Sequence, residues 1–242
     1  MAEWLGKMQA QFELNFITED RWRYITDGLA VTLKVTFFAV ILGIVIGVLI
    51  AIIRSTFDKN KKEMRPGFGK FTLSLLNALS EVYLTVIRGT PVVVQLMIMY
   101  YIIFASSNNK ILVAVLAFGI NSGAYVAEIV RSGIMSVDSG QFEAGRSLGF
   151  NYFQTMQYII VPQAFKNVLP ALANEFIVLL KETSVAGYVA LQDVTKAGDI
   201  IRSRTFSPMM PLIGVALIYL VMVMFFTWLV GKLERRLRNS ER

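Results

Sequence analysis

Two long stretches of the chain carry no charged residue. Val35–Ile53 runs for 19 residues and Thr205–Gly231 for 27 residues without Asp, Glu, Lys or Arg. A helix crosses about 30 Å of hydrocarbon with roughly 20 apolar residues, so both stretches are long enough to span a membrane. Three weaker candidates lie between them, at 89–109, 111–127 and 168–190. The pattern predicts an all-α integral membrane protein.

The segment 71–87 is ambiguous, because Glu81 interrupts its apolar pattern and Arg88-Gly89-Thr90-Pro91 ends it. It could be a sixth span, or the first half of one long span that is broken at Pro91. A break is expected there because proline cannot donate the backbone hydrogen bond that a helix interior needs.

The distribution of basic residues favours the broken span. With five spans, the loops 54–70 and 131–167 and the tail 232–242 share one side and hold 14 Lys and Arg, against 7 on the other side. Loops rich in Lys and Arg face the cytoplasm, so the N-terminus is predicted outside and the C-terminus inside. The five predicted spans lie at about 29–53, 71–105, 111–131, 168–188 and 209–231.

The first 24 residues carry Trp4, Phe12 and Trp22 among charged residues. This mixture predicts an extracytoplasmic amphipathic segment at the membrane interface, with a disordered tail as the alternative. Residues 25–231 are then one transmembrane domain, and 232–242 are a basic cytoplasmic tail.

The amino-acid composition excludes several kinds of catalytic and metal site. The 242 residues include no His and no Cys, which excludes thiol nucleophiles, imidazole bases and zinc or haem sites built on these residues. No nucleophile is paired with a base, so we expect no catalytic site and no metal site. The net charge of +7 is assigned to cytoplasmic loops rather than to a nucleic-acid surface.

Polar residues inside the fourth predicted span need an explanation, since a buried charge costs at least about 2.5–3.5 kcal/mol on insertion scales. Asn174, Glu175, Lys181 and Glu182 lie there. We expect them to line a polar route through the protein. The alternative for Lys181 and Glu182 is a position at the outer interface, where long side chains reach water.

Two further pairs concern helix packing. Gly43 and Gly47 in the first span are four residues apart, a spacing that allows close approach of a second helix. Glu128 and Arg131 at the end of the third span are three residues apart, so they can pair on one helix face.

The loop 135–162 is predicted to hold two short helices. Asp138 with Gln141 resembles a capping box that begins the first helix, and Gly149 is placed to end it in a left-handed cap. A second helix is expected from Tyr152 to Ile160, ending before Pro162. An exposed short helix can dock into a groove on a partner; a simple connector is the alternative.

The residues Glu143-Ala144-Gly145, then Gly149 and, after nine more residues, Ile159-Ile160-Val161-Pro162 resemble the cytoplasmic E-A-A loop of ABC importer permeases. Gly145 stands for the family's second alanine and Val161 for a leucine.

A second motif refines this resemblance. The run Arg88-Gly89-Thr90-Pro91, three valines and Gln95-Leu96 is similar to the signature of the polar amino-acid subgroup, and residues 121–133 and 174–176 also resemble it. Thr85 stands where many members of that subgroup carry an acidic residue.

The resemblance implies a type I importer permease in a bacterial cytoplasmic membrane. Two permease chains, identical or paralogous, would form the pathway, each docked to a cytoplasmic ATPase, with an extracytoplasmic binding protein delivering a polar or charged amino acid. The chain lacks a G-x-x-x-x-G-K-[ST] phosphate loop, so ATP and Mg²⁺ are expected on the ATPase and no cofactor on this chain.

The resemblance also implies roles for particular residues. Coupling to the ATPase is expected at Glu143, Ala144, Gly145, Ser147, Leu148 and Gly149. The substrate pathway is expected at Gln95, Asn121, Tyr125, Asn174, Glu175 and Lys181. The structural motif comprises Arg88, Gly89, Thr90, Pro91, Glu128, Arg131 and Pro162. The outer segment 191–207 is the candidate contact for the binding protein, with a solvated interfacial helix as the alternative. Its apolar residues at helical spacing are Leu191, Val194 and Ile201, and its residues expected to be exposed are Asp193, Lys196, Asp199, Arg202 and Arg204.

Other classes of protein fit the composition and topology without the motifs. A stand-alone oligomeric channel would not need the E-A-A loop. An ion-coupled amino-acid carrier is disfavoured because an odd number of spans cannot complete an inverted repeat within one chain. A membrane enzyme would have to rely on carboxylates or Lys181.

Overall fold

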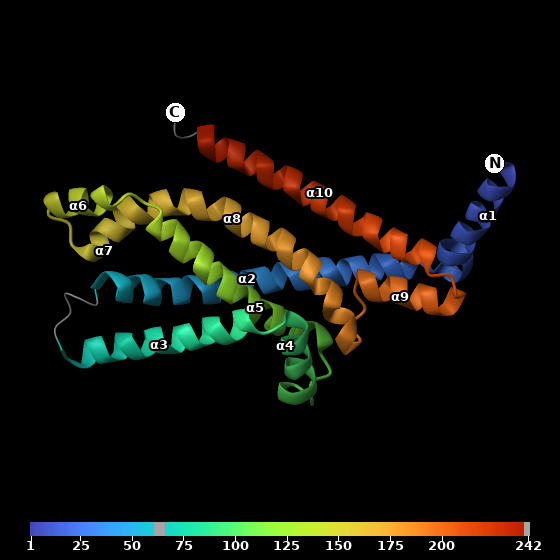
Figure 1. Cartoon of the computed structure of the whole chain (residues 1–242), viewed down its shortest axis with the longest axis horizontal. Helices are drawn as coiled ribbons and strands as arrows, with labels where there is room; N and C mark the ends of the chain where they lie inside the picture. The colour runs from blue at the N-terminus through green and yellow to red at the C-terminus, as the bar shows by residue number, and fades with distance from the viewer. Residues whose placement is uncertain (61–65, 240–242) are drawn as a thin grey trace. The chain divides into compact units, whose positions relative to one another are not determined.

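A computed structural model of the chain describes residues 1–60 and 66–239. Across these residues the regular structure is helical, without a strand (Figure 1). This agrees with the all-α prediction. Lys61, Lys62 and Arg65 of the predicted basic loop and Arg242 of the predicted tail lie outside the described residues.

The described α-helices are α1 Ala2–Phe12, α2 Trp22–Asn60, α3 Phe68–Gly89, α4 Val92–Ile98, α5 Lys110–Met135, α6 Ser139–Ser147, α7 Tyr152–Thr155, α8 Val161–Glu182, α9 Val194–Thr205 and α10 Met209–Asn239. Wider π-type turns occur at Glu13–Ile17, Met99–Ile103 and Met156–Ile160, and tighter 3₁₀ turns at Thr18–Asp20 and Thr183–Val189.

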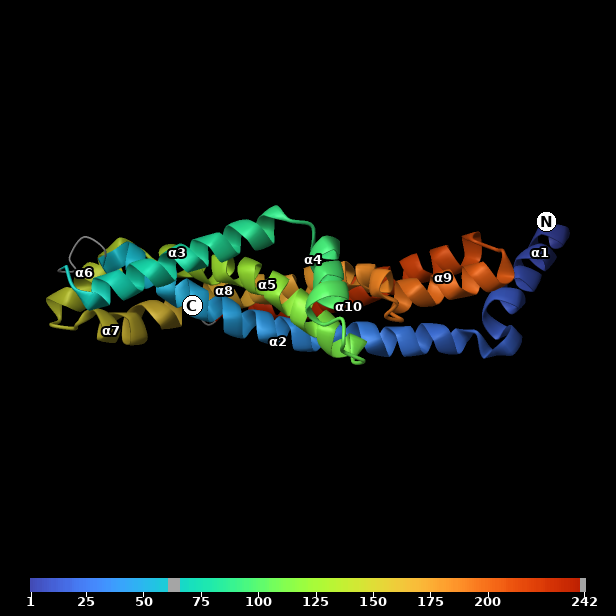
Figure 2. The ribbon, with the colours of Figure 1, turned by 90° about the horizontal axis from the view of Figure 1, so that it is seen from below.

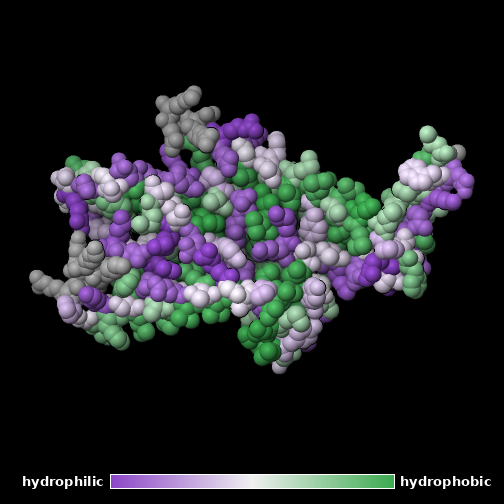
Figure 3. Space-filling model, in the orientation of Figure 1, coloured by the Kyte–Doolittle hydropathy of each residue, from purple (hydrophilic) through white to green (hydrophobic). Residues whose placement is uncertain are grey.

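Three of the described helices are long and apolar enough to cross a membrane, namely Trp22–Lys59, Lys110–Met135 and Met209–Leu237. The number is four if Phe68–Gly89 and Val92–Ile103 form one broken span. The chain does break at Thr90 and Pro91, between α3 and α4, as the proline predicts. Many large apolar side chains of α3 and α10 are exposed, as lipid-facing helices require. Figure 3 shows the apolar surface of α3 in green.

The fourth predicted span, 168–188, falls mainly in α8, which is not among the helices apolar enough to cross a membrane. Glu175, Lys181 and Glu182, together with Asn174, lower its hydropathy. The five-span topology therefore stays a prediction.

Contacts between Cα atoms divide the chain into two compact units. Unit 1 comprises 1–39, 92–118 and 177–228, and unit 2 comprises 40–91, 119–176 and 229–242.

Unit 1 contains the N-terminal segment, which is helical rather than a disordered tail. Asn15 is fully buried and ties this segment to the end of α9, because its Oδ1 accepts a hydrogen bond from Thr205 Oγ1 at 2.8 Å. At the other end of α9, a Cβ added to Gly28 of α2 would lie 2.6 Å from the carbonyl oxygen of Asp193. The first turns of α2 and α9 therefore pack backbone to backbone.

Unit 2 is built on close packing between α2 and α5. A Cβ added to Gly47 would lie 2.5 Å from Cγ1 of Val126, and one added to Gly43 would lie 2.9 Å from Cβ of Ser122. The relation is mutual, since a Cβ at Gly119 would lie 2.6 Å from Cδ2 of Leu42. These separations are shorter than carbon–carbon contact distances, so a Cβ added at any of these positions would force its neighbours to shift. The predicted close approach at Gly43 and Gly47 is confirmed.

The loop 135–162 belongs to unit 2 and folds as two short helices, α6 and α7, which contact each other. Asp138 caps α6 by accepting a hydrogen bond from the Gly140 backbone N–H at 2.6 Å. Gly149 has a φ of 80°, the predicted left-handed end. A reciprocal capping box, which the sequence analysis did not identify, joins Asn151 and Gln154 at the start of α7.

Pro162 does not end a helix, which corrects the expectation from the sequence. The chain continues from α7 through the π-type turn Met156–Ile160 into α8, and Pro162 is the second residue of that helix. Proline has no N–H, so one backbone hydrogen bond to the preceding turn is missing at Pro162, and the π-type turn Met156–Ile160 lies just before that point.

We expect Gly47→Ala to destabilise the protein by about 1–3 kcal/mol, because the added methyl group overlaps Val126 and the α5 backbone. The matched control is Gly231→Ala in α10, where an added Cβ meets nothing within 4 Å. Alanine should there be neutral or stabilising by about 0.5–1 kcal/mol. Thermal unfolding of both variants in detergent compares the two, and equal melting temperatures would contradict the packing argument.

Candidate functional site

A polar cavity of about 600 Å³ lies within unit 2. It is formed by three helices and carries both signs of charge. Its lining consists of Arg54 from α2; Glu81, Leu84, Thr85, Arg88 and Gly89 from α3; and Tyr125 and Glu128 from α5.

The charges in the cavity form two loose pairs. Nη2 of Arg54 lies 3.5 Å from Oε1 of Glu81, and Nη1 of Arg88 lies 3.5 Å from Oε1 of Glu128. Charge-assisted hydrogen bonds between such groups are about 2.7–2.9 Å long, so neither pair is closed. The Arg88 guanidinium also lies 5.9 Å from the centre of the Tyr125 ring. Both pairs can exchange partners with a ligand.

Arg54 has unused hydrogen-bonding capacity. Its side chain is 17% exposed, and its Nε is a buried donor without a partner among the described residues. Asn77 donates to Glu81 Oε1 at 3.1 Å, while its own Oδ1 is likewise buried and unpartnered in the described part of the chain. Buried polar atoms are nearly always hydrogen-bonded, so these atoms mark a place for a polar ligand or water.

The structure brings some of the predicted pathway and motif residues together. Tyr125, Arg88, Gly89 and Glu128 all line the cavity. Glu128 pairs with Arg88, whereas Arg131 pairs with Asp58 at 2.8 Å, so the expected pairing of Glu128 with Arg131 is wrong. Each side chain finds an opposite charge on a neighbouring helix instead.

Other predicted pathway residues do not line this cavity. Glu175 is buried, and its Oε1 accepts a hydrogen bond from Ser122 Oγ at 2.8 Å. Asn121 is buried and Asn174 is exposed. Gln95 and Lys181 belong to unit 1.

Arg54 and Glu81 also line the cavity, although neither is among the residues predicted for the pathway. A signal was present for both. Arg54 is the first charged residue after the apolar run that ends at Ile53, and Glu81 interrupts an otherwise apolar segment. A charge in such a position needs a partner or water, which the cavity supplies.

The predicted coupling residues lie on α6 and at its end. Glu143, Ala144, Ser147 and Leu148 are exposed, and Leu148 is 71% exposed. Gly145 is buried, and a Cβ there would lie 2.7 Å from Cγ2 of Thr155. This contact explains why glycine replaces the alanine of the family pattern. In the same loop, burial raises the pKa of Tyr152 above its ordinary value.

The outer segment follows the predicted pattern in part. Arg202 and Arg204 are exposed as expected, whereas Lys196 and Asp199 are half-buried. Leu191, Val194 and Ile201 are buried as expected. Asp193, expected to be exposed, is buried because it caps α9 by accepting a hydrogen bond from the Lys196 backbone N–H at 2.8 Å. Burial raises its pKa above the ordinary value. The half-buried carboxylate of Asp199 has a lowered pKa, because Arg202 and Lys196 donate hydrogen bonds to it.

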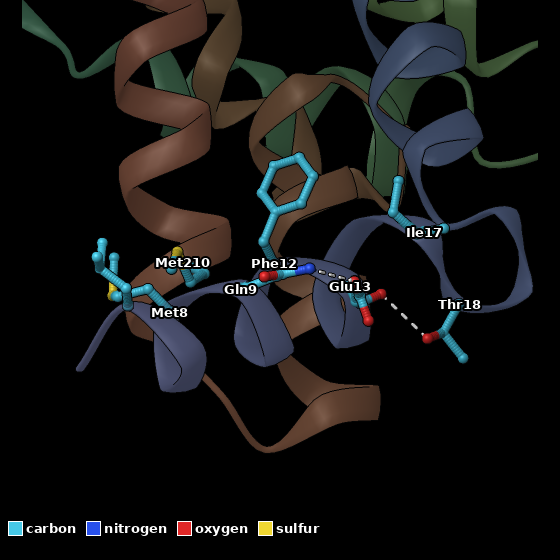
Figure 4. Close-up of a pocket in the computed structure, with 8 residues that line it drawn as sticks. Met8, Gln9, Phe12, Glu13, Ile17, Thr18 and Met210 are labelled. Atoms are coloured by element: carbon cyan, nitrogen blue, oxygen red, sulfur yellow. Dashed lines mark hydrogen bonds between the residues drawn. The ribbon is translucent and has the colours of Figure 1, made fainter. Parts of the chain in front are cut away.

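A larger cavity of about 820 Å³ lies in unit 1, around α1 (Figure 4). Leu5, Met8, Phe12, Ile17 and Met210 give it a mainly apolar lining, and Glu13 is its one charged residue. Thr18 Oγ1 donates to the Glu13 backbone carbonyl at 3.0 Å. Such a lining suits a lipid chain better than a charged solute, so the smaller polar cavity is the better candidate site for a polar solute.

Comparison with known proteins identifies the family. Residues 69–239 match the family described as "Binding-protein-dependent transport system inner membrane component". The chain belongs to this family. This permease therefore lies in the inner membrane, and membership implies an ATPase and a binding protein as its partners.

The permease is similar over nearly its whole length to named transport proteins. It is 36% identical over 222 residues to the arginine transport system permease protein ArtQ of Bacillus subtilis (strain 168). The matched residues cover 90% of this chain and 94% of ArtQ. It is 31% identical over 226 residues to the L-cystine transport system permease protein TcyB of the same organism, covering 92% and 90%. These relatives are transport permeases, and this chain is likewise a permease subunit.

Solved structures of ABC transporters have the same fold as this chain. The fold matches a chain of an amino acid ABC transporter crystallised with histidines, with a TM-score of 0.78, 41% identity and coverage of 88% of this chain and 94% of the other. It also matches a chain of the inward-facing MetNI methionine ABC transporter with a TM-score of 0.74, covering 91% and 99%; at 17% identity this likeness supports the fold alone. The type I importer permease fold is confirmed.

We expect Gly145→Ala to destabilise the loop 135–162 and to be corrected by Thr155→Ala, because the second change removes the atoms that the new methyl group would overlap. Limited proteolysis of the loop in the purified permease measures this. If the double variant is cleaved as fast as Gly145→Ala alone, the two positions are not coupled in the way that the contact implies.

Proposed function

We propose that this permease imports polar or charged amino acids and that the polar cavity of unit 2 binds the amino acid during passage. The relatives named above transport arginine or L-cystine, and the 41% identical neighbour is an amino acid ABC transporter. The observation that carries the proposal is the pair of loose Arg–Glu contacts around one cavity.

The cavity offers complementary groups for both ends of an amino acid. The guanidinium of Arg54, with its unpartnered Nε, can donate to the α-carboxylate, as Arg forms strong hydrogen bonds to carboxylates. Glu81 and Glu128 can accept from the α-ammonium group or from a cationic side chain. Because the existing pairs are 3.5 Å apart, a ligand replaces weak contacts and leaves no charge unpaired.

The rest of the proposal concerns assembly. Two permease chains, identical or paralogous, with five spans each and the N-terminus outside, would bind two cytoplasmic ATPases through α6 in a bacterial cytoplasmic membrane. ATP and Mg²⁺ would bind to the ATPases, and this chain would bind no cofactor. An extracytoplasmic amino-acid-binding protein would contact the segment 191–207.

A stand-alone oligomeric channel or an ion-coupled carrier is the alternative. Two observations favour the importer. The family is defined by dependence on a binding protein. In addition, α6 presents exposed Glu143 and Leu148 on a capped helix, the form expected of a docking element.

We expect Arg54→Gln to raise the Kd for the amino acid about tenfold to hundredfold, since hydrogen bonds to charged groups contribute about 1.5–3 kcal/mol. Equilibrium binding of radiolabelled amino acids to the purified complex measures this. Arg23→Gln is the control, because Arg23 is exposed and pairs with Asp20 in unit 1. Unchanged affinity in Arg54→Gln for every amino acid bound by the wild type would remove the cavity from the pathway.

We also expect Glu143→Arg to abolish amino-acid uptake while membrane insertion is retained, because it reverses the charge of an exposed residue on α6. Uptake by reconstituted vesicles, together with immunodetection of the permease in the membrane fraction, tests this. Uptake at the wild-type rate would show that α6 is only a connector.

A further inference from the structure

The end of α2 is attached to the loop 135–162 and to the end of α5 by three contacts from residues 56–59, about one helical turn. All of the residues concerned belong to unit 2. Asp58 Oδ2 accepts two hydrogen bonds from Arg131, from Nη2 at 2.8 Å and from Nε at 3.3 Å. Nζ of Lys59 lies 4.1 Å from the centre of the Phe142 ring on α6. Figures 1 and 2 both show the end of α2 beside α6 and α7.

A third contact reaches α7. The side chains of Thr56 and Tyr152 are hydrogen-bonded to each other. The last turns of α2 are therefore joined to α5, α6 and α7 by an ion pair, a cation–π contact and a hydrogen bond. Three different kinds of contact on three elements fix the direction of α2 as well as its position.

Phe142 connects these contacts to the docking face. It precedes Glu143, and it packs against the buried cluster of Ile134, Val137, Ile160 and Ala164. This cluster ties α6 to the ends of α5 and to α8. A displacement of α6 must therefore move Phe142, and Lys59 lies directly over its ring.

The same stretch of α2 carries Arg54 into the cavity. Arg54 precedes Asp58 by four residues, which is about one helical turn and about 6 Å along the axis. A continuous helix transmits a rotation or shift of one turn to the next. The close contact at Gly47 holds the preceding part of α2 against α5, so movement at the end of α2 is concentrated near Arg54.

We propose that Asp58 and Lys59 are positioning residues that transmit displacement of α6 to Arg54 and so link the ATPase-docking loop to the amino-acid cavity. The proposal rests on the proposed function. It adds a specific route: the ATPase acts on the bound amino acid through the end of the first long helix, in addition to any movement of α8, which follows the loop directly.

The experiment uses the complete transporter, with its ATPase and binding protein, in proteoliposomes. The double variant Asp58→Asn with Lys59→Met removes both charges and keeps similar side-chain size. Amino acid transported per ATP hydrolysed should fall about fivefold or more, the lower end of typical coupling between sites. The ATPase should still co-purify, and the Kd for the amino acid without ATP should stay within about twofold of wild type, less than the smallest coupling usually measured between two sites.

Two further variants separate transmission from simple structural support. Asp58→Glu with Lys59→Arg keeps both charges and should restore the transport-to-ATP ratio. Lys7→Met is the matched control, because Lys7 is exposed on α1 and pairs with Glu3 of the same helix. It should behave as wild type.

Each possible result either supports or overturns the proposed role of Asp58 and Lys59. A wild-type transport-to-ATP ratio in the double variant overturns the proposal. Loss of the ATPase during purification also overturns it, because the residues would then serve docking rather than transmission. If the wild-type complex itself transports no amino acid, the proposed function fails instead, and the two failures are distinguishable in the same vesicles.

Discussion

The contact between α2 and α5 is the constraint on which unit 2 depends. Gly47 lies against Val126, and Gly119 lies against Leu42, with no room for a Cβ at either glycine. Since lipid tails are as apolar as leucine, helices in a membrane gain little from the hydrophobic effect and associate through such close packing. The contact also sets the spacing of the cavity-lining groups, because Arg54 follows Gly47 by about two turns and Glu128 lies two residues after Val126.

Three ion pairs among the described residues of unit 2 each join two different helices. Arg54 meets Glu81, Arg88 meets Glu128, and Arg131 meets Asp58. Pairing across helices satisfies each charge and at the same time joins neighbouring helices. The first two pairs are loose and surround a cavity, whereas the third is close and lies near the loop 135–162. The nitrogen–oxygen distance therefore distinguishes two kinds of pair. The two pairs at 3.5 Å can exchange partners with a ligand, whereas the pair at 2.8 Å stabilises the packing of α2 against α5.

Much of this arrangement was predictable from the sequence. The long apolar runs, the break at Pro91 and the left-handed Gly149 follow from local rules, because each depends on neighbours in the chain. The spacing of Gly43 and Gly47 predicted a close helix approach, but not that α5 is the partner helix. The pairing of Glu128 was not predictable in this way. A spacing of three residues allows a pair on one helix, but the sequence alone does not tell which other helix brings Arg88 nearer. The cavity was missed for the same reason, since Arg54, Glu81 and Tyr125 are far apart in the sequence and meet only through tertiary packing.

The balance of charge in the cavity has an electrical consequence. Arg54 and Arg88 against Glu81 and Glu128 leave no net formal charge among the lining side chains. A conformational step that carried these side chains and a zwitterionic amino acid through the membrane field would therefore move almost no net charge. The membrane potential would then neither drive nor oppose that step. A cationic amino acid would add one elementary charge, worth about 2.3 kcal/mol for each 100 mV crossed. The voltage across the membrane would thus distinguish between substrates that the cavity itself accommodates in the same way.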